Sequence, residues 1–196
     1  DVKTLFDQPF ILLDGAMGTM LQQKGVKPGT VMETLSITAP EWIEDIHRAY
    51  RAAGSEILYA NTFGANRLKL EKTGYSVEQI VSASISIAKR AADGALCALD
   101  IGPTGKLLEP NGSLSFEEAY EVFAEVVKAG VSAGADLIVI ETMTDLYEMR
   151  AALLAAKEHS TLPILCTMTF EAAGRTFTGT DIRSAAISMT SLGADA

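Results

Sequence analysis

Short apolar runs alternate with longer amphipathic stretches along this chain, with a period of roughly forty residues. The apolar runs predict strands at residues 10–13, 56–62, 95–102, 137–142 and 163–170. The stretches between them space their apolar residues as a helix does and predict helices at 40–50, 77–92, 115–133, 145–158 and 181–192. Strands that alternate with helices and are apolar almost throughout indicate a parallel α/β sheet covered on both faces.

Two architectures agree with this pattern: a doubly wound sheet of about five strands and a (β/α)₈ barrel. Gly54-Ser-Glu and Gly134-Ala-Asp each come directly before a predicted strand, and Gly193-Ala194-Asp195 repeats that junction near the last residue. The chain therefore holds about five strand–helix units and the start of a sixth strand, whereas a complete barrel takes about 250 residues. We favour the N-terminal part of a barrel, because a doubly wound sheet would more naturally end on a helix.

Polar side chains close each of the predicted strands: Asp14, Asn61-Thr62, Asp100, Glu141-Thr142, and Thr167 with Thr169. Both architectures bring the carboxyl ends of the strands to one face, where ligands bind. We therefore expect Asp14, Asp100 and Glu141 to converge, which is unfavourable for like charges unless a cation or a shared proton relieves them. That cation is either a divalent metal bound by oxygen atoms or a substrate ammonium group. A simpler alternative is that each carboxylate only accepts hydrogen bonds from nearby turn amides.

The turn that follows the first predicted strand is Asp14-Gly15-Ala16-Met17-Gly18-Thr19. Gly15 and Gly18 allow successive backbone N–H groups to point at one ligand, and such a nest of donors binds an anion. A site with both an anion nest and a cluster of carboxylates suits a zwitterion. The sequence therefore predicts a site for a small amino acid.

Composition restricts the possible partners. The 196 residues are 48% hydrophobic and 21% charged, as in an ordinary globular protein, and carry a net charge of −9, so nucleic acid and anionic membrane surfaces are not expected partners. No apolar run is long enough for a membrane span, and the first thirty residues lack a signal-peptide pattern. Cys97 and Cys166 lie far apart in predicted strands, which indicates a reducing, cytoplasmic compartment.

Other possible sites have less support. Gly102-Pro-Thr-Gly105-Lys106 lacks the spacing of a nucleotide-binding P-loop, and no Gly-x-Gly-x-x-Gly follows a strand. His47 and His159 lie in predicted helices, away from the carboxyl ends of the strands. Cys97 and Cys166 stand early in their strands, and we expect both to be core residues.

The strand-end motifs resemble those of the homocysteine S-methyltransferase family. They are Asp14-Gly-Ala-Met-Gly-Thr19, Ala60-Asn-Thr-Phe-Gly-Ala-Asn66, Asp100-Ile-Gly-Pro-Thr-Gly105, Glu141-Thr142, and Met168-Thr-Phe with Thr178-Gly-Thr180. The resemblance covers essentially the whole chain and implies that residues 1–196 are the N-terminal part of a homocysteine-binding (β/α)₈ barrel, in which the homocysteine sulfur is methylated to give methionine.

The same resemblance implies roles for individual residues. Asp14 through Thr19 and Glu141 match positions at which family members bind the amino-acid end of homocysteine. Asn61, Thr62, Asp100 and Thr142 stand in motifs at the same barrel mouth. In the cobalamin-dependent members the methyl donor is methylcobalamin on another module, which a folate-binding module recharges, and we expect such modules, or chains carrying them, as partners.

One part of the family's site has no counterpart in this sequence. Family members hold a zinc ion with three cysteines near the ends of strands six and eight, and the zinc binds homocysteine as a thiolate. Those positions fall beyond Ala196, and neither Cys97 nor Cys166 matches them. We therefore expect no metal ligand and no catalytic residue in this chain. The motifs leave two alternatives open: S-methylmethionine or betaine as the methyl donor, or a non-catalytic amino-acid-binding half-barrel with a complementary partner.

Overall fold

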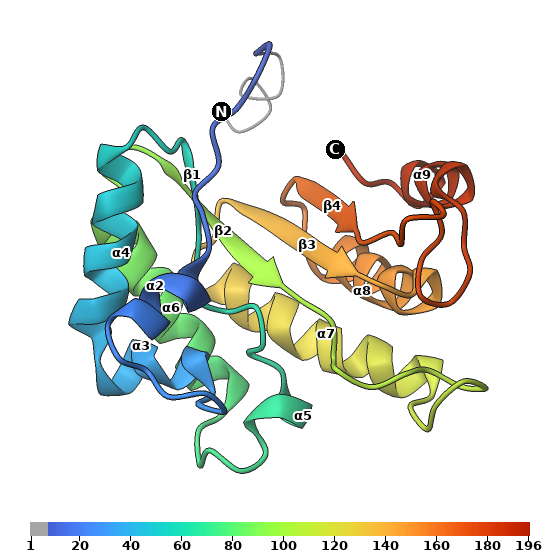
Figure 1. Ribbon diagram of the computed structural model, residues 1–196, viewed down its shortest axis with the longest axis horizontal. Helices are drawn as coiled ribbons and strands as arrows, with labels where there is room; N and C mark the ends of the chain where they lie inside the picture. Colours follow the sequence, from blue (N-terminus) through green and yellow to red (C-terminus); the bar gives the residue numbers. More distant parts are fainter. Residues whose placement is uncertain (1–7) are drawn as a thin grey trace.

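A computed structural model describes residues 8–196 as one parallel sheet with helices packed along it (Figure 1). The strands are β1 (Ile57–Tyr59), β2 (Leu96–Ile101), β3 (Leu137–Met143) and β4 (Ile164–Met168). The longer helices are α4 (Pro40–Ala52), α6 (Val77–Ala91), α7 (Phe116–Ser132), α8 (Leu146–His159) and α9 (Ile182–Ser191). Short helical turns are α2 (Met17–Gln23), η1 (Met32–Thr34), α3 (Leu35–Thr38) and α5 (Arg67–Leu70).

The order of the strands decides between the two predicted architectures. The strands lie in chain order, β1-β2-β3-β4, and every neighbouring pair is parallel. The helices also follow chain order: α4 packs on α6, α6 on α7, α7 on α8, and α8 on α9. A doubly wound sheet reverses its strand order at a switch point, whereas sequential strands with sequential helices form the wall of a barrel. The prediction of a barrel is confirmed.

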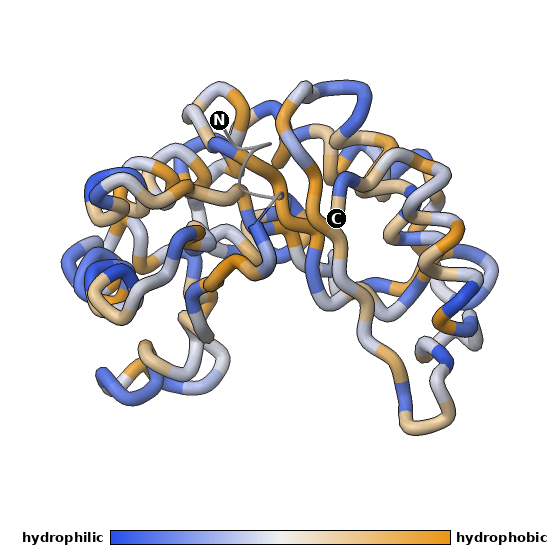
Figure 2. The backbone as a smooth tube through the Cα atoms, turned by 90° about the horizontal axis from the view of Figure 1, so that it is seen from above, coloured by the Kyte–Doolittle hydropathy of each residue, from blue (hydrophilic) through white to orange (hydrophobic). Residues whose placement is uncertain are grey.

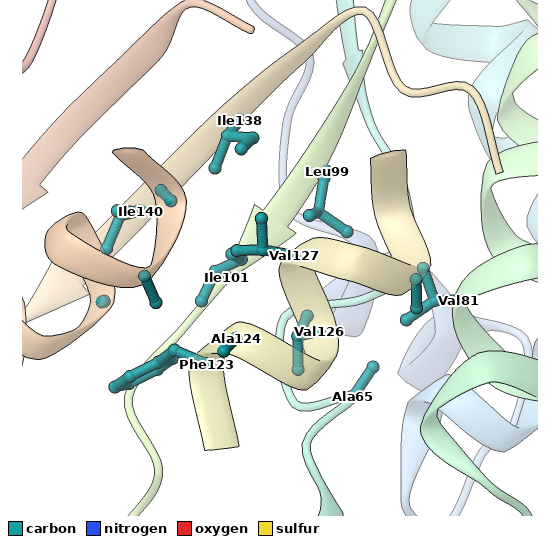
Figure 3. Close-up of a cluster of buried hydrophobic side chains, with 14 of the residues drawn as sticks. Ala65, Val81, Leu99, Ile101, Phe123, Ala124, Val126, Val127, Ile138 and Ile140 are labelled. Carbon is teal, nitrogen blue, oxygen red and sulfur yellow. The ribbon is translucent and has the colours of Figure 1, made fainter. Parts of the chain in front are cut away.

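The two faces of the sheet are packed differently. One face, which carries Leu99, Ile138 and Ile140, packs against α7 around Phe123 and Val127 (Figure 3). The opposite face forms a separate buried cluster whose members all come from strands or from the extended segment before α2: Ile11, Ile57, Tyr59, Leu96, Ala98, Leu137, Val139 and Leu165. Among the described residues the helices therefore cover one face, and side chains of the strands themselves bury the other, as in the interior of a barrel. Figure 2 shows the apolar strands between more polar helices.

The first predicted strand, residues 10–13, is extended but joins the sheet through a single bridge between Leu13 and Ile57. The Leu12 carbonyl accepts from Glu56 N–H at 2.7 Å, as in a parallel ladder. However, Leu12 N–H donates to the Glu56 carboxylate at 2.9 Å, so a side chain takes the place of a backbone carbonyl there. The ladder is interrupted for this reason, and the segment is not a regular strand.

The acid of each Gly-x-acid junction performs the same task in the fold. The Asp136 carboxylate accepts from Cys97 N–H at 2.8 Å, and the Asp195 carboxylate accepts from Ile164 N–H at 2.9 Å. Together with Glu56, each acid that opens one strand satisfies a backbone donor of the strand before it. The segment at 194–196 also lies beside β4, since Cys166 N–H donates to the Ala196 carbonyl at 2.8 Å. This is where the sixth strand was expected to begin.

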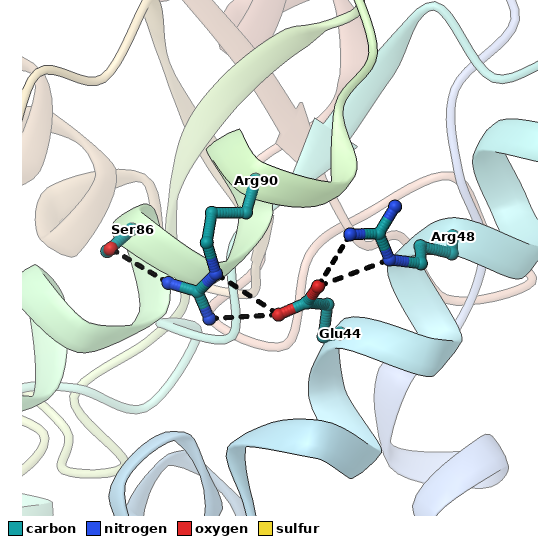
Figure 4. A network of polar contacts seen from close by, with 4 residues as sticks. All are labelled: Glu44, Arg48, Ser86 and Arg90. Atoms are coloured by element: carbon teal, nitrogen blue, oxygen red, sulfur yellow. Dashed lines mark hydrogen bonds and ion pairs between the residues drawn. The ribbon is translucent and has the colours of Figure 1, made fainter.

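Local signals set the ends of the long helices. Pro40 stands in the first turn of α4, and Ser76 with Gln79 forms a capping box on α6. Between these helices, Glu44 accepts from both Arg48 and Arg90, at 2.7 and 2.9 Å (Figure 4). Exposed ion pairs of this kind contribute little, so the apolar faces hold the helices on the sheet. Within residues 8–196 no helix is long and apolar enough to cross a bilayer.

Candidate substrate site

A cavity of about 310 Å³ opens at the carboxyl end of the strands. It is lined by Asp14, Gly15, Ala16, Met17, Tyr59, Ala60, Asn61, Phe63, Asp100 and Glu141. The three carboxylates expected to converge do so. No lysine, arginine or histidine lines this cavity, so nothing in the described part of the chain neutralises the acids within it.

Asp14 follows the extended segment that lies beside β1. Its carboxylate accepts from the backbone N–H of Tyr59 at 2.9 Å, which fixes the side chain against the end of β1. Its pKa is raised to about 7, mainly by burial and also by the nearby charge of Glu141, whereas the Tyr59 hydrogen bond opposes the shift. Asp14 therefore changes charge close to neutral pH.

Asp100 is the most deeply buried of the three acids. Its backbone is locked to the β1 loop by the Thr62 hydroxyl, which donates to the Asp100 carbonyl at 2.8 Å and accepts from the Asp100 N–H at 3.0 Å. One carboxyl oxygen, Oδ1, has no hydrogen-bond partner. Burial raises the pKa of Asp100 well above its ordinary value, and the charges of Glu141 and Asp14 add to the shift. Burial therefore favours the neutral, protonated form of the Asp100 carboxyl group.

Glu141 stands near the end of β3 and is half-buried. Burial raises its pKa above the ordinary range, because the cavity replaces part of the water around its carboxylate. All three acids are therefore easier to ionise when a cation is beside them. The arrangement favours a ligand that brings a positive charge into the cavity.

The turn after Asp14 offers backbone donors on one side of the cavity. Helix α2 begins at Met17, and its N-cap residue, Ala16, supplies no side-chain acceptor for the first amides of the helix. Gly15 fits here because a Cβ at this position would stand 2.8 Å from the Tyr50 ring. Gly15, Ala16 and Met17 line the cavity, whereas Gly18 and Thr19 lie inside α2 and do not. The backbone N–H donors at the cavity are therefore those of Gly15 and Ala16, which precede α2, and of Met17, its first residue.

Comparisons with known proteins agree with this geometry. A model of the homocysteine S-methyltransferase family matches residues 11–196. The chain belongs to this family. It is 29% identical over 216 aligned positions to the methionine synthase of Mycobacterium tuberculosis (strain ATCC 25618 / H37Rv), and 28% identical over 218 positions to that of Mycobacterium leprae (strain TN). All of the chain is covered in both alignments, but it spans only 18% of the length of either relative.

The fold of this homocysteine S-methyltransferase family member is also that of a solved relative. The homocysteine methyltransferase MmuM from Escherichia coli superposes in its metallated form with a TM-score of 0.86 at 22% identity, covering 98% of this chain and 74% of MmuM. The apo form of MmuM gives a TM-score of 0.75. At this identity the likeness concerns the fold, and it agrees with the barrel wall described above.

Three predicted site residues have structural tasks in this family member. The Asn61 amide lines the cavity, but its nitrogen donates away from it, to the Met32 carbonyl at 2.9 Å. Thr62 is buried and locks the Asp100 backbone. Thr142 is exposed and does not line the cavity. The hydrogen bonds made by these three side chains therefore do not direct them into the cavity.

Tyr59, Ala60 and Phe63 line the cavity and were missed in the sequence. Tyr59 shares the alternation of Ile57 in β1, so strand periodicity could have placed it on the cavity face. The Phe63 ring fills the space that a Cβ at Gly102 would need, and the Lys69 ammonium lies 5.2 Å from its centroid. That neighbourhood depends on contacts between separate loops, for which the sequence gives no local signal.

The residues that the structure describes do not fit a zinc ion. Across residues 8–196 no group of three or more His, Cys, Asp or Glu side chains is placed to hold a metal. Cys97 is buried and Cys166 partly buried, and burial raises the pKa of each thiol to about 12, which opposes the thiolate form that metals bind. His47 and His159 do not line the cavity either. The described residues therefore form a cavity lined by carboxylates and no metal centre.

Proposed function

We propose that the full-length protein transfers a methyl group to the sulfur of homocysteine, and that this chain binds the amino-acid end of that substrate. The observation that carries the proposal is a cavity with three carboxylates, no basic side chain and the donors of a helix start on one side. A ligand with one ammonium and one carboxylate group complements both halves of this cavity. Membership of the homocysteine S-methyltransferase family supports homocysteine as that amino acid.

In this proposal Asp14 and Glu141 bind the ammonium group. Asp100 beside them remains protonated, which limits the repulsion between the acids. The substrate carboxylate accepts hydrogen bonds from the backbone N–H groups at Gly15–Met17, near the positive end of α2. The remaining cavity wall, Phe63 and Met17, then faces the side chain that carries the sulfur. The polar contacts thus fix the orientation of the substrate and leave the sulfur free to react.

Zinc and methylcobalamin belong to the same proposal, but the residues of this chain supply neither. We propose that the ligands of a zinc ion, together with the cobalamin-carrying and folate-binding modules, lie outside residues 1–196. The chain spans 18% of the methionine synthases that it matches, which leaves room for such regions in a protein of that kind. On this view residues 1–196 are the N-terminal part of the homocysteine-binding barrel, in a protein of the cytoplasm.

Two alternatives make different predictions for the full-length protein. A donor such as S-methylmethionine or betaine would support methionine formation without cobalamin. A non-catalytic amino-acid-binding protein would bind homocysteine and form no methionine with any donor. An assay of methionine formation with each donor in turn separates these cases.

Replacing Glu141 tests the proposed binding mode. In the full-length protein we expect Glu141→Gln to raise the KM for homocysteine by about 10- to 100-fold, because a charge-assisted hydrogen bond to the ammonium is lost. Glu125→Gln is the matched control, since Glu125 is an exposed glutamate on α7 that pairs with Arg67 and does not line the cavity. An unchanged KM in Glu141→Gln, or an equal rise in the control, would show that Glu141 does not bind the substrate.

A further inference from the structure

Strand β3 contains one more residue than β4 across the stretch that ends at the cavity. Ile140 pairs with Cys166 and Met143 pairs with Met168, so three steps along β3 correspond to two steps along β4. An extra residue of this kind is a β-bulge, which bends a strand and changes the direction of its side chains. The bulge spans Glu141 and Thr142.

The bulge begins at Glu141, the residue of β3 that lines the cavity. In a regular strand, residues three apart face opposite sides, yet Ile140 and Met143 both belong to the core cluster on the helix side of the sheet. The extra residue resolves this difference by returning Met143 to the helix side. Glu141 itself lies on the cavity side by regular alternation from Leu137 and Val139. Because a bulge bends the strand, the backbone at residue 142 fixes where the Glu141 carboxylate lies within the cavity.

Thr142 adopts a conformation that a β-branched residue seldom takes. Its φ is 54°, in the left-handed region, where steric repulsion of the branched side chain is unfavourable. Such strain persists only where neighbouring contacts hold it, and it is concentrated at functional sites. Thr142 is one of two non-glycine residues with positive φ in the described chain, and it directly follows a residue that lines the cavity.

The contact that holds Thr142 comes from β4. Thr142 N–H donates to the Thr167 hydroxyl at 3.0 Å, so a side-chain oxygen replaces the backbone carbonyl that a regular ladder would offer. The Thr142 hydroxyl donates to the Glu141 carbonyl at 2.9 Å. Regular pairing resumes just beyond, where Thr169 N–H donates to the Met143 carbonyl at 2.9 Å. Thr167 is thus the side chain that completes the bulge.

We propose that Thr167 is a positioning residue for substrate binding: it holds the strained bulge at Thr142 and thereby fixes the position of the Glu141 carboxylate within the cavity. The inference rests on the proposed role of Glu141 in binding the substrate ammonium. Thr167 does not line the cavity, so its effect on the substrate passes through Glu141 alone. That dependence distinguishes positioning from a general contribution to folding.

The test uses Thr167→Val in the full-length protein, because valine keeps the shape of threonine and removes the acceptor. We expect a rise of about fivefold or more in the KM for homocysteine with kcat changed less than twofold, and Thr167→Ser to restore the KM to within twofold of the wild type. In a Glu141→Gln background, Thr167→Val should raise the KM no further. If the valine variant does not fold, Thr167→Ala replaces it in the same comparisons.

Three outcomes would overturn the inference. The first is an unchanged KM in Thr167→Val while Glu141→Gln raises it. The second is an equal KM rise in the wild-type and Glu141→Gln backgrounds, which would mean that Thr167 acts without Glu141. The third is a serine variant as impaired as the valine variant. An unchanged KM in Glu141→Gln itself would instead contradict the proposed function.

Discussion

Burial of the ionised Asp14 carboxylate destabilises the folded protein, and a bound cation would offset this destabilisation. Its pKa is about 7 in the folded protein, against an ordinary value of 3.8. Between these values the folded state holds a proton that the unfolded state has lost, so stability falls as the pH rises from about 4 to about 7. This is the reverse of the usual behaviour of a paired aspartate. A substrate ammonium group placed beside Asp14 would offset that cost.

Asp14→Asn should therefore stabilise the protein at pH 8 and impair it as an enzyme. The asparagine side-chain oxygen can still accept from Tyr59 N–H, and the buried charge is gone. We expect a gain on the order of 2 kcal/mol in unfolding free energy at pH 8, discounted for partial exposure, and little change at pH 4. Chemical denaturation at the two pH values measures this. A loss of stability at pH 8 would contradict the assigned pKa shift.

At the scale of single elements, helix α4 contains a buried side chain without partners. His47 is fully buried, and neither ring nitrogen forms a hydrogen bond. Burial lowers its pKa to about 4, although the nearby Glu44 opposes the shift. The unfolded chain therefore binds a proton that the folded chain does not between about pH 6.5 and pH 4, and the helix loses stability as the pH falls through that range.

His47→Leu should remove this sensitivity to acid. Leucine has a similar volume and leaves no unsatisfied nitrogen in the core. Lowering the pH from 8 to 5 costs the histidine-containing protein about 2 kcal/mol through this group, and the leucine variant should avoid that loss. Amide hydrogen exchange of residues 40–52 at both pH values measures it. Equal loss of protection in both proteins at pH 5 would exclude His47 as the cause.

How far sequence predicts an element depends on whether its signal is local. The five long helices and the three strands from β2 to β4 appear where periodicity predicts them, because a continuous apolar face and a capping residue such as Ser115 or Asp181 are local features. The predicted strand at 56–62 shortens to Ile57–Tyr59, since the chain turns at Thr62 to bond the Asp100 backbone. The bulge at Thr142 depends on Thr167, which is distant in sequence.

At the scale of the whole molecule, the site residues placed by strand topology could be predicted from the sequence, and those placed by contacts between loops could not. Parallel strands end at one edge, so the convergence of Asp14, Asp100 and Glu141 follows from topology and was predicted. The contacts of Phe63 with Gly102 and Lys69 join three loops and have no counterpart in the pattern. Gly18 and Thr19 lie inside α2 and Thr142 lies in the β3 bulge, and none of the three lines the cavity.

The central claim is that raised-pKa carboxylates in this cavity bind the ammonium group of an amino acid. Its most direct test is titration calorimetry of the full-length protein with L-methionine, the proposed product, at pH 6.5 in two buffers of different ionisation enthalpy. Methionine carries the amino-acid end without a thiol, so any proton released comes from the protein. We predict release of about half a proton or more per ligand, reduced in Asp14→Asn, because the ammonium drives ionisation of Asp14. Binding without proton release, or with proton uptake, would contradict the account.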